Sequence, residues 1–229
     1  MIFSKNLIKG KFIKRYKRFF IDIFLNNKKI TAHCPNTGSM LGLLNKNADV
    51  WVSTNNNPKR KLKFTIELIK ANKKLVGVNT HRANRIVEHG LNNSLIKEFQ
   101  SIKKIKPEFK YSEDTRFDFL CDEKILIEVK NVTLNRKNNI AEFPDSVTER
   151  GSKHLRKLID SLKFGYKPFV LFLVQIENIN KFKIAKDIDL DYYKNFLNAK
   201  KKGVKFIAYN CKLSSKQIVI DKKIIIKHE

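Results

Sequence analysis

The feature that most constrains the fold is a pair of short apolar strands that each carry charge near their centre. Residues 116–120 and 125–130 both alternate apolar and polar side chains, and the gap between them has about the length of a hairpin loop. A three-residue loop would place Asp118 and Glu128 directly opposite each other on one face of the hairpin. Like charges in that arrangement destabilise paired strands, and unpaired charge is costly to bury. The pattern therefore indicates a cation between the carboxylates, and a divalent metal is the natural candidate.

The charge balance indicates a polyanionic partner. The formal net charge is +26, and nucleic acid is the default partner for a chain this basic. A second interpretation stays open, because the abundance of Lys, Asn and Ile with only 8 Gly is also what an AT-rich genome would produce.

The remaining composition describes a folded protein with no membrane segment. Hydrophobic residues make up 42% of the chain, yet no apolar run approaches the ~20 residues that span a bilayer. The first residues lack the features of a secretory signal, so we expect a cytoplasmic protein. The three cysteines are far apart and unpaired in pattern, which predicts reduced thiols and no zinc site.

The spacing of apolar residues divides the chain into two blocks. Residues 1–80 contain five or six short strands separated by turns such as Asn26-Asn27, which predicts an OB-like barrel. Residues 81–229 predict the order α-β-β-β-α-β, with helices over 82–99, after 145–148 and over 192–202. The predicted fold class is α+β, with an N-terminal barrel and a C-terminal mixed sheet like that of restriction endonucleases.

Asp118 followed by Glu128-Val129-Lys130 on the next strand resembles the PD-(D/E)xK nuclease superfamily. The chemistry is consistent with that resemblance: Asp118 and Glu128 can bind Mg²⁺ or Mn²⁺ through hard oxygen ligands, and Lys130 can orient the attacking water or offset transition-state charge. The alternative is a solvated hairpin with a surface Glu-Lys pair.

The two predicted helices near this hairpin add further candidates. Glu88 lies at helical spacing from Leu91 and Leu95, which turns it inward as a possible third metal ligand or leaves it as a boundary glutamate. Pro144-Asp145 follows the Glu-x-Lys run, so Asp145 or Ser146 is expected to cap the next helix. The polar face of that helix carries Arg150, Lys153 and His154, which either contact phosphates or form a solvated face.

The N-terminal block offers a second set of nucleic-acid contacts. Tyr16 lies among Arg15, Lys17 and Arg18, a mixture of aromatic and basic residues with which OB-folds hold single strands. The loop with Asn36, Thr37 and Ser39 can contact phosphates or bases, although a plain turn with a helix cap also accounts for it.

Several longer runs resemble one family in their order along the chain and in their residues. This family is the sugar fermentation stimulation protein A family of bacteria and archaea. The matching runs are residues 15–19, 32–44, 57–62, 77–80, 116–120, 128–134 and 143–151. The resemblance implies an OB-like domain, a nuclease-like domain and DNA binding, with Lys59 and Arg60 among the basic residues of a matched run. It also implies a role in sugar utilisation, maltose in particular.

Two functions follow from the sequence. The first is a Mg²⁺- or Mn²⁺-dependent nuclease that acts on single- or double-stranded DNA through Asp118, Glu128 and Lys130. The second is a non-catalytic, weakly sequence-specific DNA-binding regulator of sugar utilisation genes, since no base-reading helix is evident.

Overall fold

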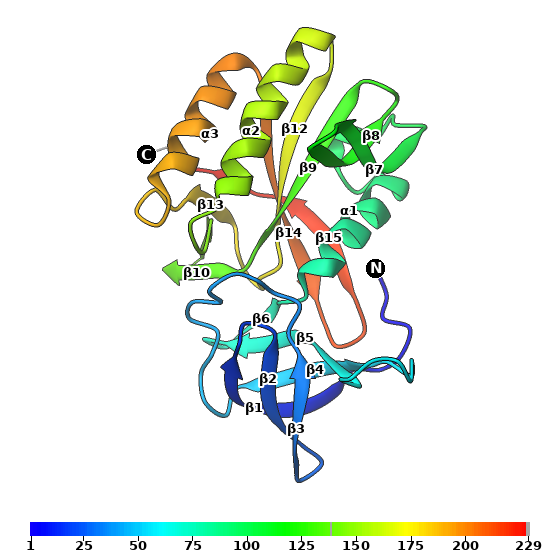
Figure 1. Ribbon diagram of the computed structural model, residues 1–229, viewed down its shortest axis with the longest axis vertical. Coiled ribbons are helices and arrows are strands. Elements are labelled where there is room, and N and C mark those ends of the chain that lie inside the picture. Colours follow the sequence, from blue (N-terminus) through cyan, green and yellow to red (C-terminus); the bar gives the residue numbers. More distant parts are fainter. Residues whose placement is uncertain (138, 228–229) are drawn as a thin grey trace.

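The N-terminal third of the chain folds into a small closed barrel. The computed structural model describes residues 1–137 and 139–227, and Figure 1 shows the barrel below a larger domain. The barrel strands are β1 (Ile8–Tyr16), β2 (Phe20–Leu25), β3 (Lys28–His33), β4 (Asp49–Thr54), β5 (Phe64–Ala71) and β6 (Lys74–Gly77). They lie in the order β3-β2-β1-β4-β5-β6, and a further β3–β5 pairing closes the first five into a barrel. The predicted OB-like barrel is confirmed.

Tight turns set the register of the first barrel strands. Asn26 and Asn27 both adopt positive φ, at 46° and 59°, and join β2 to β3 as the sequence predicted. Asn tolerates this left-handed region better than most residues do. Lys17 and Arg18 adopt the same conformation at the turn between β1 and β2, where neither residue type is favoured.

The C-terminal domain is a mixed sheet with helices on both faces. Its main sheet has the order β15-β14-β12-β9-β8-β7. These strands are β7 (Ile105–Ser112), β8 (Thr115–Cys121), β9 (Ile125–Val132), β12 (Lys167–Val174), β14 (Lys205–Leu213) and β15 (Ile218–Lys223). A smaller sheet consists of β10 (Leu134–Lys137), β11 (Ile140–Phe143), β13 (Lys181–Ile184) and β16 (Ile225–Ile226). The three α-helices are α1 (Ala83–Asn92), α2 (Glu149–Ser161) and α3 (Leu190–Lys202).

The two faces of β9 meet different helices. Leu126 and Val132 pack in the cluster that contains Leu155 of α2, whereas Ile127 and Val129 pack in the cluster of α1. Figure 1 shows α2 and α3 on one side of the sheet and α1 on the other. Alternation along the strand therefore turns Glu128 toward α2.

Two helix predictions were wrong in detail. Helix α1 ends at Asn92 instead of Phe99, because the chain turns at Ser94 with a φ of 54°, and Leu95 is 37% exposed. Helix α2 is capped by Thr148, whose hydroxyl accepts from the Gly151 N–H at 3.1 Å, and not by Asp145 or Ser146. The earlier residues follow a cis Phe143–Pro144 bond and remain outside the helix.

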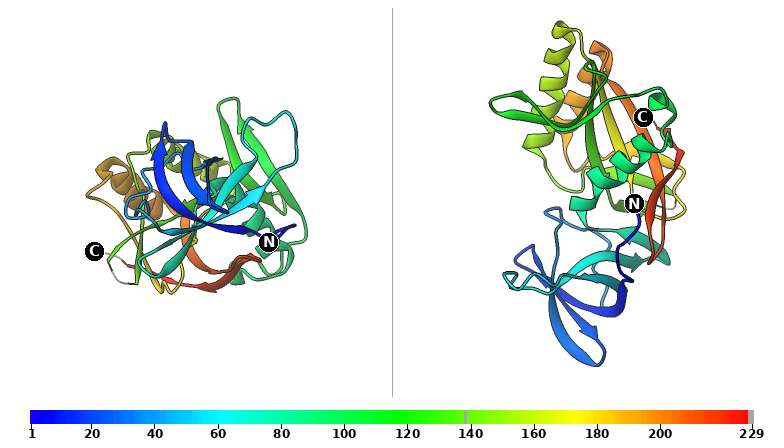
Figure 2. Two further views of the ribbon diagram at one scale, coloured as in Figure 1. Left: turned by 90° about the horizontal axis from the view of Figure 1, so that it is seen from below. Right: turned by 90° about the vertical axis from the view of Figure 1, so that its right-hand side faces the viewer.

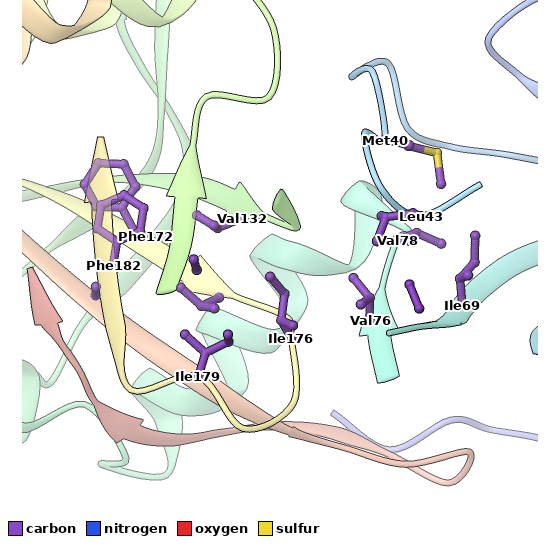
Figure 3. Packing of buried hydrophobic residues seen from close by; sticks show 14 of the residues in the cluster. Met40, Leu43, Ile69, Val76, Val78, Val132, Phe172, Ile176, Ile179 and Phe182 are labelled. Carbon is purple, nitrogen blue, oxygen red and sulfur yellow. The ribbon is translucent and has the colours of Figure 1, made fainter. Parts of the chain in front are cut away.

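The barrel and the C-terminal domain share one apolar core. Figure 3 shows Met40, Val76 and Val78 of the barrel facing Val132 and Ile176 of the larger domain, all within one buried cluster. The Gly77 N–H also donates to the Gln175 carbonyl at 2.9 Å, beside a β-bridge from Val76 to Ile176.

A second connection joins the start of the chain to the hairpin of β14 and β15. Phe3 N–H donates to the Lys216 carbonyl at 2.9 Å, and Ile2 bridges Gln217. Figure 2 shows this N-terminal segment passing from the barrel toward α1 and β15. Within the described chain, no helix is both long and apolar enough to cross a membrane.

Candidate active site

The hairpin of β8 and β9 has the three-residue loop that the sequence predicted. Phe119 pairs with Ile127, Leu120 with Leu126 and Cys121 with Ile125, which leaves 122–124 as the loop. The same register sets Asp118 opposite Glu128, but the recorded pairing of the two strands stops one residue earlier. The carboxylates therefore lie at the point where β8 separates from β9.

Asp118 supplies a hydrogen-bond acceptor at this separation. Its Oδ2 accepts from the Val129 N–H at 2.6 Å, and its Oδ1 accepts from Asn84 Nδ2 of α1 at 2.7 Å. A side-chain oxygen thus satisfies a backbone donor beyond the last strand pair. Burial, together with the negative charge of Glu128, raises the pKa of Asp118 to about 7.

Glu128 has one oxygen bound on two sides and one oxygen with no partner. Its Oε1 accepts from Lys130 Nζ at 2.6 Å and lies 2.6 Å from His154 Nδ1. Its Oε2 is buried and has no hydrogen-bond partner among the described residues. Burial acts to raise the pKa of Glu128, but Lys130 and His154 hold it below its ordinary value. The carboxylate is therefore kept charged with an oxygen left over.

This donor set fits a divalent cation held by two carboxylates. A buried, charged oxygen without a donor is costly, and a hard cation satisfies it. Mg²⁺ commonly takes only one or two protein carboxylates and fills its other positions with water and substrate oxygens. Among residues 1–137 and 139–227, no three His, Cys, Asp or Glu side chains gather closely enough to hold an ion.

The structure brings Asn84 rather than Glu88 to the carboxylates. Glu88 lies one turn further along the same side of α1, and it does not join Asp118 and Glu128 in a three-ligand group. Asn84 donates to Asp118 and also approaches Glu108 at 3.3 Å. Sequence analysis missed Asn84, although its spacing of four residues from Glu88 puts both on the same stripe.

His154, for which the sequence left a phosphate contact or a solvated face open, does not face solvent. It is buried, bonded to Glu128, and its ring contacts Phe117 edge-on with centroids 6.1 Å apart. Arg150, the second candidate residue of this helix, is exposed. Lys153, the third, forms an ion pair with Asp114 at 2.9 Å. His154 thus holds the Glu128 carboxylate instead of facing solvent.

Arg15 and Asn36 serve the barrel loop itself. The Arg15 guanidinium donates to the carbonyls of Asn36 at 2.7 Å and Gly38 at 3.0 Å. Asn36 is buried, donates to the Val78 carbonyl at 3.2 Å, and accepts from the Gly38 N–H. The polar groups of both side chains are therefore largely occupied within the protein.

That loop packs against the segment before α2. Ser39 Oγ donates to the Asp145 carbonyl at 2.7 Å, and the Met40 N–H donates to Asp145 Oδ2 at 3.2 Å. A Cβ on Gly38 would overlap the Asp145 carboxylate, so only glycine allows this approach. The Thr37 side chain is exposed at the rim of a cleft of about 690 Å³. This cleft lies between the loop and residues 143–148.

The remaining barrel candidates are on the surface. Tyr16 is 36% exposed, stacks on Phe20 at 5.5 Å, and donates its hydroxyl to Asp22 at 3.2 Å. Lys17 and Arg18 are exposed at the turn after β1. Lys59 is exposed in the loop before β5, and Arg60 Nη2 lies 3.5 Å from Thr65 Oγ1.

Two family descriptions match separate parts of the chain. Residues 13–78 match the family described as the SfsA N-terminal OB domain, and residues 81–217 match the sugar fermentation stimulation protein RE domain. The chain belongs to the sugar fermentation stimulation protein family.

Members of this family match the chain over almost its whole length. A sugar fermentation stimulation protein homolog of Pelagibacter ubique (strain HTCC1062) is 60% identical, covering 99% of each chain. The homolog of Brucella anthropi is 41% identical over 95% of this chain and 96% of its own. A solved structure, described as Pyrococcus furiosus SfsA in complex with Ca²⁺, has a TM-score of 0.89 and 23% identity, covering 100% of this chain and 98% of that one. The resemblance seen in the sequence is confirmed, and so is the fold.

Proposed function

We propose that this member of the sugar fermentation stimulation family is a metal-dependent nuclease, and that the active site that cleaves DNA contains Asp118 and Glu128. One observation carries the proposal: the buried Oε2 of Glu128 has no partner while its Oε1 is held by two donors. A purely structural Glu-Lys pair would not require a second charged oxygen to be buried without a donor.

Each side chain has a defined task in this proposal. Asp118 and Glu128 would hold Mg²⁺ or Mn²⁺, which polarises the scissile phosphate and lowers the pKa of the attacking water. Asn84 and the Val129 N–H fix the Asp118 carboxylate, and His154 fixes Glu128. Lys130, only 12% exposed at its side chain, orients the water or offsets negative charge that develops on the phosphate.

Basic residues on both sides of the acidic pair supply the contacts to DNA. A hollow of about 310 Å³ beside His154 is lined by Lys110, Arg116 and Arg150, while Arg18 lines the cleft between the domains. Lys17, Lys59 and Thr37 are also exposed on the barrel. With a net charge of +26, most of the affinity comes from phosphate contacts and falls steeply with salt.

The experiment compares cleavage by the wild-type protein and Glu128→Gln. Supercoiled and single-stranded DNA are incubated with Mg²⁺, Mn²⁺ or a chelator, and products are resolved by electrophoresis. Loss of a carboxylate that binds the ion should reduce the rate at least about 10³-fold, comparable to loss of a main electrostatic group. Glu149→Gln, which removes an exposed carboxylate at the start of α2, is the matched control and should cleave normally.

A second candidate is a DNA-binding regulator without catalysis. The names of the relatives favour it, since they describe stimulation of sugar fermentation. Absence of cleavage by wild type with either metal, together with salt-sensitive DNA binding that Glu128→Gln leaves unchanged, would reject the nuclease and support the regulator.

A further inference from the structure

A cavity of about 570 Å³ lies between the barrel and α1, apart from the acidic pair. Its walls come from the N-terminal segment, the ends of β3, β4 and β5, and the first turn of α1. The lining includes Lys5, His33, Arg60, His81, Arg82 and Arg85. This volume is that of a small-molecule site.

The cavity is strongly basic. None of its described lining residues carries a carboxylate, whereas Lys5, Arg60 and Arg85 line it without a recorded ion pair. Arg82 differs, because its guanidinium binds the buried Glu67 through two bonds, at 2.7 and 3.1 Å. Glu67 is thus neutralised beneath the floor and does not offset the other cations.

Glu67 also holds in place side chains that line the cavity. Its carboxylate accepts from Ser53 Oγ at 2.7 Å and from Asn79 Nδ2 at 2.9 Å, and its side chain is fully buried. These bonds, with the two from Arg82, fix three lining residues without a ligand. A site whose walls are already ordered loses less entropy on binding than a mobile surface does.

Two histidines, His33 and His81, also line the cavity. Burial together with the charges of Arg60 and His81 lowers the pKa of His33, which favours its neutral form. An anion placed among these groups offsets the positive charges that lower this pKa. Hydroxyls of Ser4, Thr54 and Thr65 offer further donors at the same walls.

We propose that this interdomain cavity binds a phosphate monoester of nucleotide size, with Arg60 and Arg85 as its principal phosphate ligands. Arginine suits this task because its planar guanidinium donates two parallel bonds to a phosphate. The ligand is either a free nucleotide or the phosphorylated end of a nucleic-acid strand. The site is independent of the proposed nuclease, since it uses neither Asp118 nor Glu128.

The position of the cavity gives the site a relation to the acidic pair. The first turn of α1 carries Arg85 to the cavity and Asn84 to Asp118. The two sites therefore lie on two sides of one helical turn, and a strand end bound in the cavity starts next to the carboxylates.

Isothermal titration of the full chain with AMP and with adenosine tests the proposal. We expect one AMP per chain and binding at least about 100-fold tighter than that of adenosine, because a doubly charged phosphate gains two charge-assisted contacts. Arg60→Ala with Arg85→Ala should weaken AMP binding at least about tenfold. Lys201→Ala with Lys202→Ala, in the last turn of α3, removes the same charge far from the cavity and should leave binding unchanged.

Arg85→Ala alone serves as a variant that should fold normally, since this exposed side chain has no recorded partner to lose. A comparison of 5′-phosphorylated and 5′-hydroxyl oligonucleotides then separates the two sources. Tighter binding of the phosphorylated strand, lost in the Arg60/Arg85 variant, identifies a strand end, and equal binding of the two strands identifies the free nucleotide. Equal affinity for AMP and adenosine, or equal losses in the cavity and α3 variants, would overturn the proposal.

Discussion

Divalent cations should stabilise this protein through Glu128, and the size of the effect follows from the site. We expect a dissociation constant of roughly 0.1 mM for Mn²⁺ at two carboxylates. At 10 mM Mn²⁺, about 100 times that value, folding gains about 2.7 kcal/mol. For a chain of this length each kcal/mol shifts Tm by about 2–4 °C, so Tm should rise by about 5–11 °C.

Glu128→Gln should abolish most of this rise. The amide keeps an oxygen for Lys130 and His154 but removes the charge at the unpartnered position. One unit charge about 4 Å from another contributes about 4 kcal/mol at an effective dielectric constant of 20, so affinity should fall at least about 100-fold. The stabilisation at 10 mM Mn²⁺ then drops to about 0.4 kcal/mol or less.

Differential scanning calorimetry with and without Mn²⁺ measures both shifts. NaCl at equal ionic strength controls for screening of the +26 charge, and Glu149→Gln controls for loss of one exposed carboxylate. If Glu128→Gln retains the full rise in Tm, the ion binds elsewhere and the assignment of the metal centre is wrong.

Two further predictions concern contacts elsewhere in the fold. Gly38→Ala should lower the free energy of unfolding in urea by about 1–3 kcal/mol, because the new Cβ overlaps the Asp145 carboxylate. Adding Asp145→Ala to the same chain should recover part of that loss. Purely additive effects of the two substitutions would contradict this explanation. Glu142→Gln should cost about 3 kcal/mol at pH 7, since Arg136 binds this buried carboxylate at 2.7 and 2.9 Å. Although burial acts to raise the pKa of Glu142, Arg136 holds it below the ordinary 4.5, so its stabilisation is complete above pH 4.5 and is lost as the pH falls through the folded-state pKa. Stability curves of wild type and variant should therefore converge at low pH, and a constant gap between them would refute the assignment.

Strand alternation and loop length are local properties, so the sequence could place Asp118 and Glu128 on one face of a hairpin. The pairing of Phe119 with Ile127 gives the three-residue loop for which the two carboxylates would be opposite, although the strand pairing ends there. The same reasoning found the turn at Asn26-Asn27, since its residues tolerate the left-handed conformation locally.

Partners of the site that come from distant elements were not predictable in this way. For His154 the sequence left a phosphate contact and a solvated face open, but the position of α2 over β9 turns it inward toward Glu128. Asp145 was expected to cap a helix, yet it meets Gly38 of the barrel across the domain boundary. Both outcomes depend on tertiary packing, which overrides the local preference of the residue.

The shared core between barrel and larger domain limits how the two domains can move. Hinged domains are joined through narrow, polar connections, whereas here Val76 and Val78 continue the apolar packing of Ile176 and backbone bonds cross the boundary. The two domains therefore act as one rigid body. If the proposed DNA substrate binds, it has to fit a surface that already exists, and discrimination among nucleic acids would come from how readily each one bends or opens to match that surface.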